Sequence, residues 1–213
     1  MTNEERNEKM FKVVFIGDSG VGKSRLFSSC TDTEYENATI AGSFYLIKEI
    51  NLEGKLIKLQ FMDANGLYHT SKLAKCFTKN NDGYIFAYDI TKRKSFENIQ
   101  SWMNEVNPNA PQDAYRVLVG CKCDCEKKRA VRKEEGERFA GQHCMPFFET
   151  SAKNSINVEE MVMAIAKAMK NKADGLCINV NNNIDINVEN FQPNNENLQE
   201  GQKIQDNLAY QIN

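Results

Sequence analysis

Residues 17–24, which read Gly-Asp-Ser-Gly-Val-Gly-Lys-Ser, restrict the fold of this chain more than any other segment. They fit the phosphate-loop pattern, in which two glycines separated by four residues precede lysine and then serine or threonine. The apolar run Phe11–Gly17 predicts a buried strand before the loop, and residues 20–30 predict a loop that enters a helix. A strand, this loop and a helix in that order predict an α/β fold that binds nucleoside phosphates.

The chemistry of phosphate binding explains the residue types in this loop. Glycines let backbone N–H groups turn toward phosphate oxygens, and the helix that follows points its positive end at them. We expect Lys23 to neutralise the β- and γ-phosphates and the Ser24 hydroxyl to bind magnesium. A glycine-rich turn that happens to precede a lysine is the alternative. The predicted nucleotide-binding residues of this segment are Asp18, Ser19, Gly20, Val21, Gly22, Lys23, Ser24 and Arg25.

The rest of the chain alternates short apolar runs with segments of helical period, which is typical of parallel strands joined by helices. We predict a P-loop NTPase G domain with a mostly parallel six-stranded sheet and helices on both faces. Residues 1–9 are predicted to be flexible, residues 10–170 to form the domain, and the Asn-rich residues 171–213 to be disordered. The predicted strands are 11–17, 43–52, 55–63, 83–90, 116–121 and 146–149. Besides the helix that begins within 20–30, the predicted helices are 73–79, 95–106, 132–142 and 158–170.

Composition excludes several classes of function. The formal net charge of −2 offers no general attraction to nucleic acid. The N-terminus is charged and lacks the apolar core of a signal peptide, and no apolar run is long enough to span a bilayer. Seven cysteines without a secretory signal predict reduced thiols, and Cys121, Cys123 and Cys125 lack a fourth ligand at zinc-site spacing. We therefore expect a cytoplasmic protein.

Two later segments predict which base is bound. Lys122 and Asp124 follow a predicted strand, at the edge where open α/β sheets bind their ligands. A carboxylate there accepts hydrogen bonds from the N1–H and 2-amino groups of guanine, which adenine does not match. Residues Glu149–Lys153 end the next strand and can close the pocket with backbone donors. A small-molecule kinase shares the phosphate loop, but these two segments argue against it.

These residues together resemble the small GTPase superfamily. Phe11–Ser24, Tyr88-Asp89-Ile90 and Glu149–Lys153 are most similar to the Rab branch, and the resemblance covers about residues 10–170. It implies binding of GTP or GDP with Mg²⁺ and a function as a molecular switch in vesicle traffic. It also implies catalytic roles for Lys23 and Gly66, magnesium binding by Ser24, Thr39 and Asp63, and base or ribose contacts by Lys122, Asp124, Cys125, Ser151, Ala152 and Lys153.

The chain departs from the family pattern at three places. Leu67 stands where the family has the glutamine that orients the attacking water, so we expect slow GTP hydrolysis. Cys121 replaces the asparagine that ties the base loop to the phosphate loop, which predicts faster nucleotide exchange. The first switch is shorter than usual, so Thr39 competes with Thr33 for the magnesium-binding role. An activating protein that supplies a glutamine and a scaffold that does not cycle are the alternatives.

The resemblance further implies effectors and exchange factors that bind the switch regions. The aromatic effector surface of Rabs corresponds here to Tyr45, Met62 and Phe77, although packing beside the core explains such residues equally well. The last cysteine of the chain is Cys177, whereas Rabs usually end in prenylated cysteines. We therefore expect membrane contact only indirectly, through a partner that recruits the protein to endomembranes.

Overall fold

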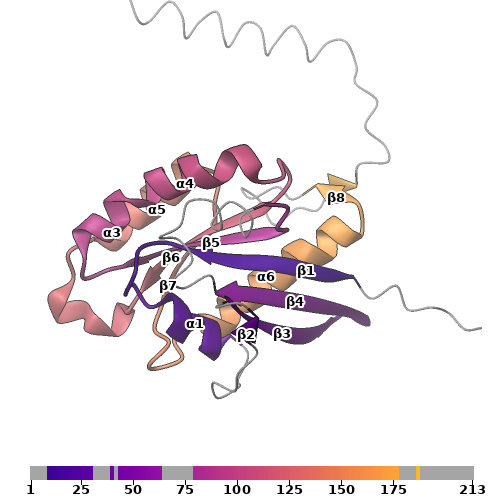
Figure 1. The fold of residues 1–213 in the computed structure, drawn as a ribbon, viewed down its shortest axis with the longest axis horizontal. Coiled ribbons are helices and arrows are strands. Elements are labelled where there is room, and N and C mark those ends of the chain that lie inside the picture. Colours follow the sequence, from indigo (N-terminus) through magenta and orange to yellow (C-terminus); the bar gives the residue numbers. More distant parts are fainter. Residues whose placement is uncertain (1–8, 31–38, 41–42, 64–78, 178–185, 188–213) are drawn as a thin grey trace, which may run out of the picture.

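The structure is a computed structural model, and it describes residues 9–30, 39–40, 43–63, 79–177 and 186–187. Within these residues one seven-stranded sheet has the strand order β2-β3-β4-β1-β5-β6-β7 (Figure 1). Its strands are β1 (Met10–Ile16), β2 (Thr39–Ile40), β3 (Ser43–Leu52), β4 (Lys55–Asp63), β5 (Gly83–Asp89), β6 (Tyr115–Cys121) and β7 (Phe147–Thr150).

All six predicted strands are present. β3 and β4 pair antiparallel around the turn at Glu53-Gly54, and β4, β1, β5, β6 and β7 are parallel, as expected. The seventh strand, β2, pairs antiparallel with β3 at the edge of the sheet. Sequence periodicity did not predict it because two residues are too few to show an alternating pattern.

Helices cover both faces of the sheet, which confirms the predicted architecture. α1 and α6 pack on one face over a core cluster centred on Phe15 and Phe61, and α4 and α5 pack on the other over Tyr84 and Phe86. The helices are α1 (Lys23–Ser29), α3 (Arg93–Glu97), α4 (Ile99–Val106), α5 (Lys133–Gln142) and α6 (Val158–Ala173), with short 3-10 turns η2 (Asn107–Asn109) and η3 (Cys123–Lys128).

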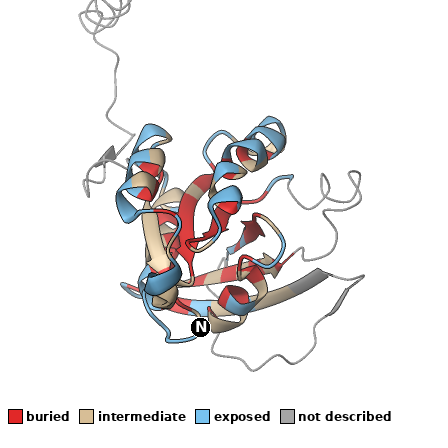
Figure 2. Ribbon diagram, turned by 90° about the vertical axis from the view of Figure 1, so that its left-hand side faces the viewer, coloured by how far each residue is buried: buried red, intermediate tan, exposed pale blue. Residues whose placement is uncertain are grey.

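Burial follows this layering. Every residue of β5 is buried, as expected for a central strand covered on both faces. Figure 2 shows the middle of the sheet buried and the outward sides of the helices exposed. The carboxyl ends of β1, β5, β6 and β7 therefore meet at one edge of a rigid core, where loops can present polar groups.

Three details differ from the predicted elements. The predicted helix 95–106 is two helices, α3 and α4, and it begins at Arg93 rather than behind a capping Ser95. The Ser95 hydroxyl instead donates to the Lys92 carbonyl and accepts from the Asp89 backbone N–H, which links α3 to the end of β5. The predicted helix 73–79 lies, except for its last residue, outside the described residues.

The last helix also extends past its predicted end at residue 170. α6 continues to Ala173, and β8 (Leu176–Cys177) then pairs antiparallel with β9 (Ile186–Asn187). β1 starts at Met10, and the predicted bounds of the domain stay a prediction. Disorder in the rest of the tail stays a prediction. Within the described ranges, no helix has the length and apolar character that a bilayer crossing requires.

Candidate nucleotide-binding site

The phosphate loop joins the carboxyl end of β1 to the start of α1. Gly17 has a φ of 144°, and a Cβ added there would lie 2.1 Å from the Ala87 carbonyl oxygen. Gly22 precedes α1 with a φ of 116°. L-residues with side chains rarely adopt these angles, so both glycines are needed for the loop to turn back over the strands. The helix then begins at Lys23, directly behind the loop.

Lys23 lies inside this loop and is 3% exposed. Its Nζ donates to the Gly17 carbonyl at 2.8 Å and to the Asp18 carbonyl at 2.7 Å. Burial lowers the pKa of Lys23 below its ordinary value, although the negative charges of Asp63 and Asp18 act in the opposite direction. A buried ammonium surrounded by backbone is a binding group for an anion, because added negative charge offsets the loss of hydration.

The Asp18 carboxylate is bound by α4 and its N-cap residue. It accepts 2.8 Å hydrogen bonds from Asn98 Nδ2 and from Trp102 Nε1. The nucleotide contact predicted for Asp18 stays a prediction, and the structure shows its carboxylate engaged by α4. Sequence reasoning missed Asn98 and Trp102, because no local pattern reveals that α4 lies against the loop. The only signal in the sequence for this contact was that Trp102 is the single tryptophan of the chain.

Lys122 connects the base-binding segment to the phosphate loop, as the resemblance implied. It has a φ of 66°, and its Nζ donates to the Gly20 carbonyl at 3.0 Å and to Asp89 Oδ2 at 2.6 Å. Asp89 is fully buried, and its Oδ1 accepts from the N–H and hydroxyl of Thr91. Burial acts to raise the pKa of Asp89, but the hydrogen bonds from Lys122 and Thr91 hold it below its ordinary value. Asp89 is thus a site residue that the motif Tyr88-Asp89-Ile90 contained but that was not singled out.

Asp124 is oriented by Ser151. The Ser151 hydroxyl donates to Asp124 Oδ1 at 2.6 Å, and this hydrogen bond is the main reason that the pKa of Asp124 is lowered. The Ser151 N–H bonds the Ile156 carbonyl at 3.1 Å, and Ser151 is completely buried. The base contact predicted for Ser151 stays a prediction, and both of its donors are engaged within the protein. Its part is to hold Asp124.

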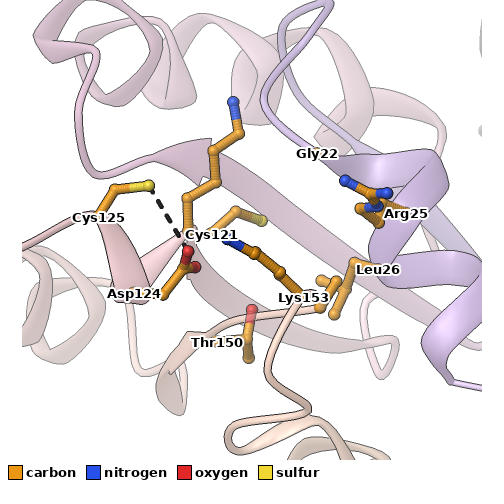
Figure 3. Close-up of a pocket in the computed structure, with 10 residues that line it drawn as sticks. Gly22, Arg25, Leu26, Cys121, Asp124, Cys125, Thr150 and Lys153 are labelled. Carbon is orange, nitrogen blue, oxygen red and sulfur yellow. Dashed lines mark hydrogen bonds between the residues drawn. The ribbon is translucent and has the colours of Figure 1, made fainter.

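A pocket lies between α1, the end of β6 and the end of β7, as Figure 3 shows. Most of its lining residues were predicted to bind the nucleotide, and Thr150 belongs to the segment 149–153 that was predicted to close the pocket. Sequence reasoning missed Leu26. Its lining consists of Gly22, Arg25, Leu26, Cys121, Lys122, Asp124, Cys125, Thr150, Ala152 and Lys153. Residues from the phosphate loop and from both base segments thus surround one space.

Cys121, at the floor of this pocket, is 4% exposed. Burial raises the pKa of its thiol to about 12, so the group is neutral at physiological pH. A Cβ added at Gly22 would lie 3.6 Å from the Cys121 Cβ, so the side chain sits beneath the phosphate loop. The base loop therefore meets the phosphate loop here through a neutral thiol.

The predicted magnesium ligands fit a hard cation as far as they are described. Ser24 lies in the first turn of α1, and the Asp63 carboxylate is fully buried at the end of β4, beside Phe15 of β1. Hydroxyl and carboxylate oxygens are the ligands that Mg²⁺ prefers, and Asp63 lies near enough to Lys23 to act on its pKa. The backbone of Thr39 begins β2. Gly66, Leu67 and the alternative Thr33 lie outside the described residues.

The predicted partner surface is partly described. Tyr45 of β3 lies opposite Met62 of β4 in the sheet register, and both side chains are half-buried. Met62 also packs against the core cluster that α4 and α5 cover. The two strands therefore present a joined apolar pair, of which Met62 serves the core as well. Phe77 lies outside the described residues.

Comparisons with known proteins agree with this geometry. Residues 12–171 match the Ras family. Ras-related protein Rab-13 of Bos taurus is 40% identical over 82% of this chain and 87% of its own length. Ras-related protein Rab-10 of Diplobatis ommata is 39% identical over 76% of this chain and 82% of its own length. GTP-binding protein ypt2 of Schizosaccharomyces pombe is 35% identical over 83% of this chain and 91% of its own length.

Proposed function

Because this chain belongs to the Ras family of small GTPases and is Rab-like, we propose that it is a GTP-binding switch of vesicle traffic whose hydrolysis step is slow. One observation carries the guanine-nucleotide part of this proposal. Lys122 bonds both Gly20 of the phosphate loop and the buried Asp89, and Asp124 stands two residues further on. Phosphate and base recognition are thus held at a fixed spacing, as one nucleotide requires.

The chain's own residues perform most of the binding. Backbone N–H groups of residues 17–22 and the start of α1 face the phosphates, and the buried ammonium of Lys23 offsets their charge. Asp124, held ionised by Ser151, accepts from the N1–H and 2-amino groups of guanine. Phosphate and base each meet groups that the fold has already oriented.

Mg²⁺, when bound, supplies positive charge to the β- and γ-phosphate oxygens. Ser24 and Asp63 would hold it, with Thr39 as the third candidate on the chain. We propose that Gly66 donates its N–H to the γ-phosphate, as the family resemblance implies. These contacts bind and orient the triphosphate, but none of them positions the attacking water.

Slow hydrolysis follows from Leu67. In phosphoryl transfer the protein mainly positions groups and stabilises charge, and the family's glutamine orients the attacking water. A leucine side chain neither donates nor accepts a hydrogen bond, so water at this position lacks its orienting partner. The GTP-bound state would then persist until an activating protein supplies the missing group.

A scaffold that does not cycle is the second candidate. Leu67 favours it, and so does Cys121, because a thiol replaces the asparagine that joins the two loops in the family. Both candidates share the fold and the partner-binding strands β3 and β4. They differ only in whether nucleotide turns over, so kinetics separates them.

The test identifies the nucleotide that co-purifies with the protein and then times hydrolysis. Released guanine and adenine nucleotides are separated by ion-exchange chromatography, and single-turnover phosphate release is followed for the native chain and for Leu67→Gln. We expect bound GTP or GDP, slow release by the native chain, and release at least about tenfold faster by Leu67→Gln, since about 1.4 kcal/mol of barrier corresponds to tenfold. Native and glutamine chains that both bind GTP but release no phosphate favour the scaffold. A pocket that takes up no guanine nucleotide under excess GTP and magnesium contradicts the proposal.

We further propose that the protein acts in the cytoplasm and reaches endomembranes through partners that bind its switch regions. Tyr45 and Met62 belong to this surface, with Phe77 as the third position. Effector capture by GTP-loaded protein, compared with GDP-loaded protein, tests this. A partner that binds both forms equally does not read the nucleotide state.

A further inference from the structure

An arginine joins the two base-binding segments without entering the pocket between them. Arg129 follows η3, the short turn that carries Asp124. Its two terminal nitrogens, Nη1 and Nη2, donate to Glu149 Oε1 at 2.6 Å and to Glu149 Oε2 at 2.9 Å. The side chains are 16% and 10% exposed, so water screens this bidentate pair only weakly. We call it the Arg129–Glu149 clamp.

The rest of the guanidinium is also engaged. Its Nε and Nη2 donate to the Glu126 carboxylate at 2.8–2.9 Å, and Nη1 donates to the Val131 carbonyl at 3.0 Å. Hydrogen bonds from Arg129 to Glu149 and then to Glu126 raise the pKa of Arg129 above its ordinary value. Such a saturated planar group holds one orientation, and a lysine cannot reproduce its two parallel bonds. Arg129 therefore binds Glu126 within η3 and Glu149 of β7, and so joins the two elements.

The clamp acts on the same two segments that Asp124 and Ser151 join. Glu149 lies at the end of β7, two residues before Ser151, and the Ser151 hydroxyl bonds Asp124 at 2.6 Å. The Glu149 carbonyl also accepts from Asn157 Nδ2 at 2.7 Å, which secures it to the N-cap of α6. Two links, one at Asp124 within η3 and one at Arg129 just after it, thus hold the base segments together. The end of η3 is also tied to β5, because the N–H groups of Ala130 and Val131 donate to the Ile90 carbonyl, so loss of the clamp should shift η3 without releasing it.

We propose that Arg129 is a positioning residue for guanine recognition: through Glu149 it sets where Asp124 stands relative to the base pocket. This inference rests on the proposed guanine-nucleotide binding and deepens it. Arg129 does not line the pocket, so its effect on the ligand passes entirely through η3 and β7. Loss of the clamp should therefore weaken the contact that Asp124 makes with the 2-amino group more than the contacts with the phosphates.

The test compares affinities for GTP and for inosine triphosphate, which lacks only the 2-amino group, in the full chain with magnesium. For Arg129→Gln we expect the preference for GTP over inosine triphosphate to fall by about tenfold, which corresponds to about 1.4 kcal/mol. Arg129→Lys keeps the charge without the planar fork and should give a smaller fall. Glu149→Gln removes the other half of the clamp and should repeat the effect, so the proposal stays testable if one variant fails to fold.

The chain offers a matched control. Arg93 Nη1 and Glu135 Oε2 also lie 2.6 Å apart, with Arg93 46% and Glu135 14% exposed, and neither residue lines the pocket. Because Arg93 is more exposed than Arg129, Arg93→Gln should lower the melting temperature less than Arg129→Gln does, and it should leave the base preference within about twofold of the native value. An unchanged preference in Arg129→Gln and Glu149→Gln, with a lowered melting temperature, overturns this inference alone. Failure of the native chain to bind GTP overturns the proposed function and this inference with it.

Discussion

Thr150 lies beside Cys121 in the register of β7 and β6, and in the part of the chain that the structure describes no hydrogen bond of ordinary geometry reaches the Thr150 hydroxyl. Thr150 is 1% exposed, and both residues line the base pocket. A weak hydrogen bond between the Thr150 side chain and the Cys121 thiol opposes, in part, the rise that burial causes in the pKa of Cys121. A thiol is a weak hydrogen-bonding group, and a buried hydroxyl with no partner at all costs about 1–3 kcal/mol. The floor of the pocket therefore lacks a strong hydrogen bond at Cys121, the position where the family has asparagine.

Cys121→Asn should strengthen nucleotide binding. An amide can both donate and accept, so it can satisfy the Thr150 hydroxyl and reach toward the phosphate loop beside Gly22. We expect GDP to dissociate about fivefold to a hundredfold more slowly, as one recovered buried hydrogen bond of about 1–3 kcal/mol implies. Release of a fluorescent GDP analogue after addition of excess GDP measures the rate.

Thr150→Val supplies the control for this prediction. Valine removes the hydroxyl but keeps the shape of threonine, so in this background the gain from Cys121→Asn should shrink markedly. An equal gain in both backgrounds would show that asparagine acts on the phosphate loop alone. Faster GDP release in Cys121→Asn would mean that the pocket floor gains no hydrogen bond from the amide.

Trp102 should report on the phosphate loop. Its indole N–H donates to the Asp18 carboxylate, and no second tryptophan contributes to the fluorescence. We expect the tryptophan emission to shift when nucleotide is removed with a chelator. Trp102→Phe should speed GDP release by about tenfold or more, since a hydrogen bond to a charged group contributes about 1.5–3 kcal/mol, and the bond that Asn98 keeps limits the effect. An emission that is identical with and without nucleotide argues against coupling between α4 and the loop.

Gly17→Ala should disrupt the conformation of the phosphate loop. The new Cβ would lie 2.1 Å from the Ala87 carbonyl oxygen, and the φ of 144° is unfavourable for alanine. We expect insoluble protein or loss of GTP binding in equilibrium titration. Gly141→Ala is the matched control, because Gly141 lies in α5 with open space around it. That variant should be as stable as the native chain or slightly more so. Normal GTP binding by Gly17→Ala would mean that the loop has another conformation.

Acid should weaken the contact between α3 and α5. Hydrogen bonds from Arg93 and from the Arg132 backbone N–H lower the pKa of Glu135 from 4.5 to about 2. A lowered pKa in the folded state adds stability that is complete above about pH 4.5 and is lost as the pH falls toward 2. Urea unfolding of Glu135→Gln should therefore differ from the native chain more at about pH 6.5 than at about pH 3.5. If the difference in the free energy of unfolding between the two proteins does not change with pH, ionisation of Glu135 does not stabilise the fold.

Sequence patterns predicted the six longer strands of the sheet and the helices on its two faces, because the residue types within each segment indicate these elements. The phosphate loop needs glycines at strained angles, β5 is apolar throughout most of its length because both faces are covered, and the hairpin turn is marked by Glu53-Gly54. The exceptions are short or non-local. β2 has two residues, and Ser95 bonds the end of β5 instead of capping a helix. A cap and a contact with a neighbouring strand use the same hydroxyl, and the sequence does not distinguish them.

The amino-acid sequence by itself determined which chemical groups this protein has available. The spacing of the glycines, Lys23 and Asp124 along the chain is enough to predict their roles. Tertiary structure alone decided how these groups are held. Asp89 holds Lys122, Trp102 holds Asp18, and Arg129 joins η3 to Glu149, each across 20 or more residues of chain. Such contacts depend on which strands and helices become neighbours, and that order is set by packing the whole sheet between its two layers of helices.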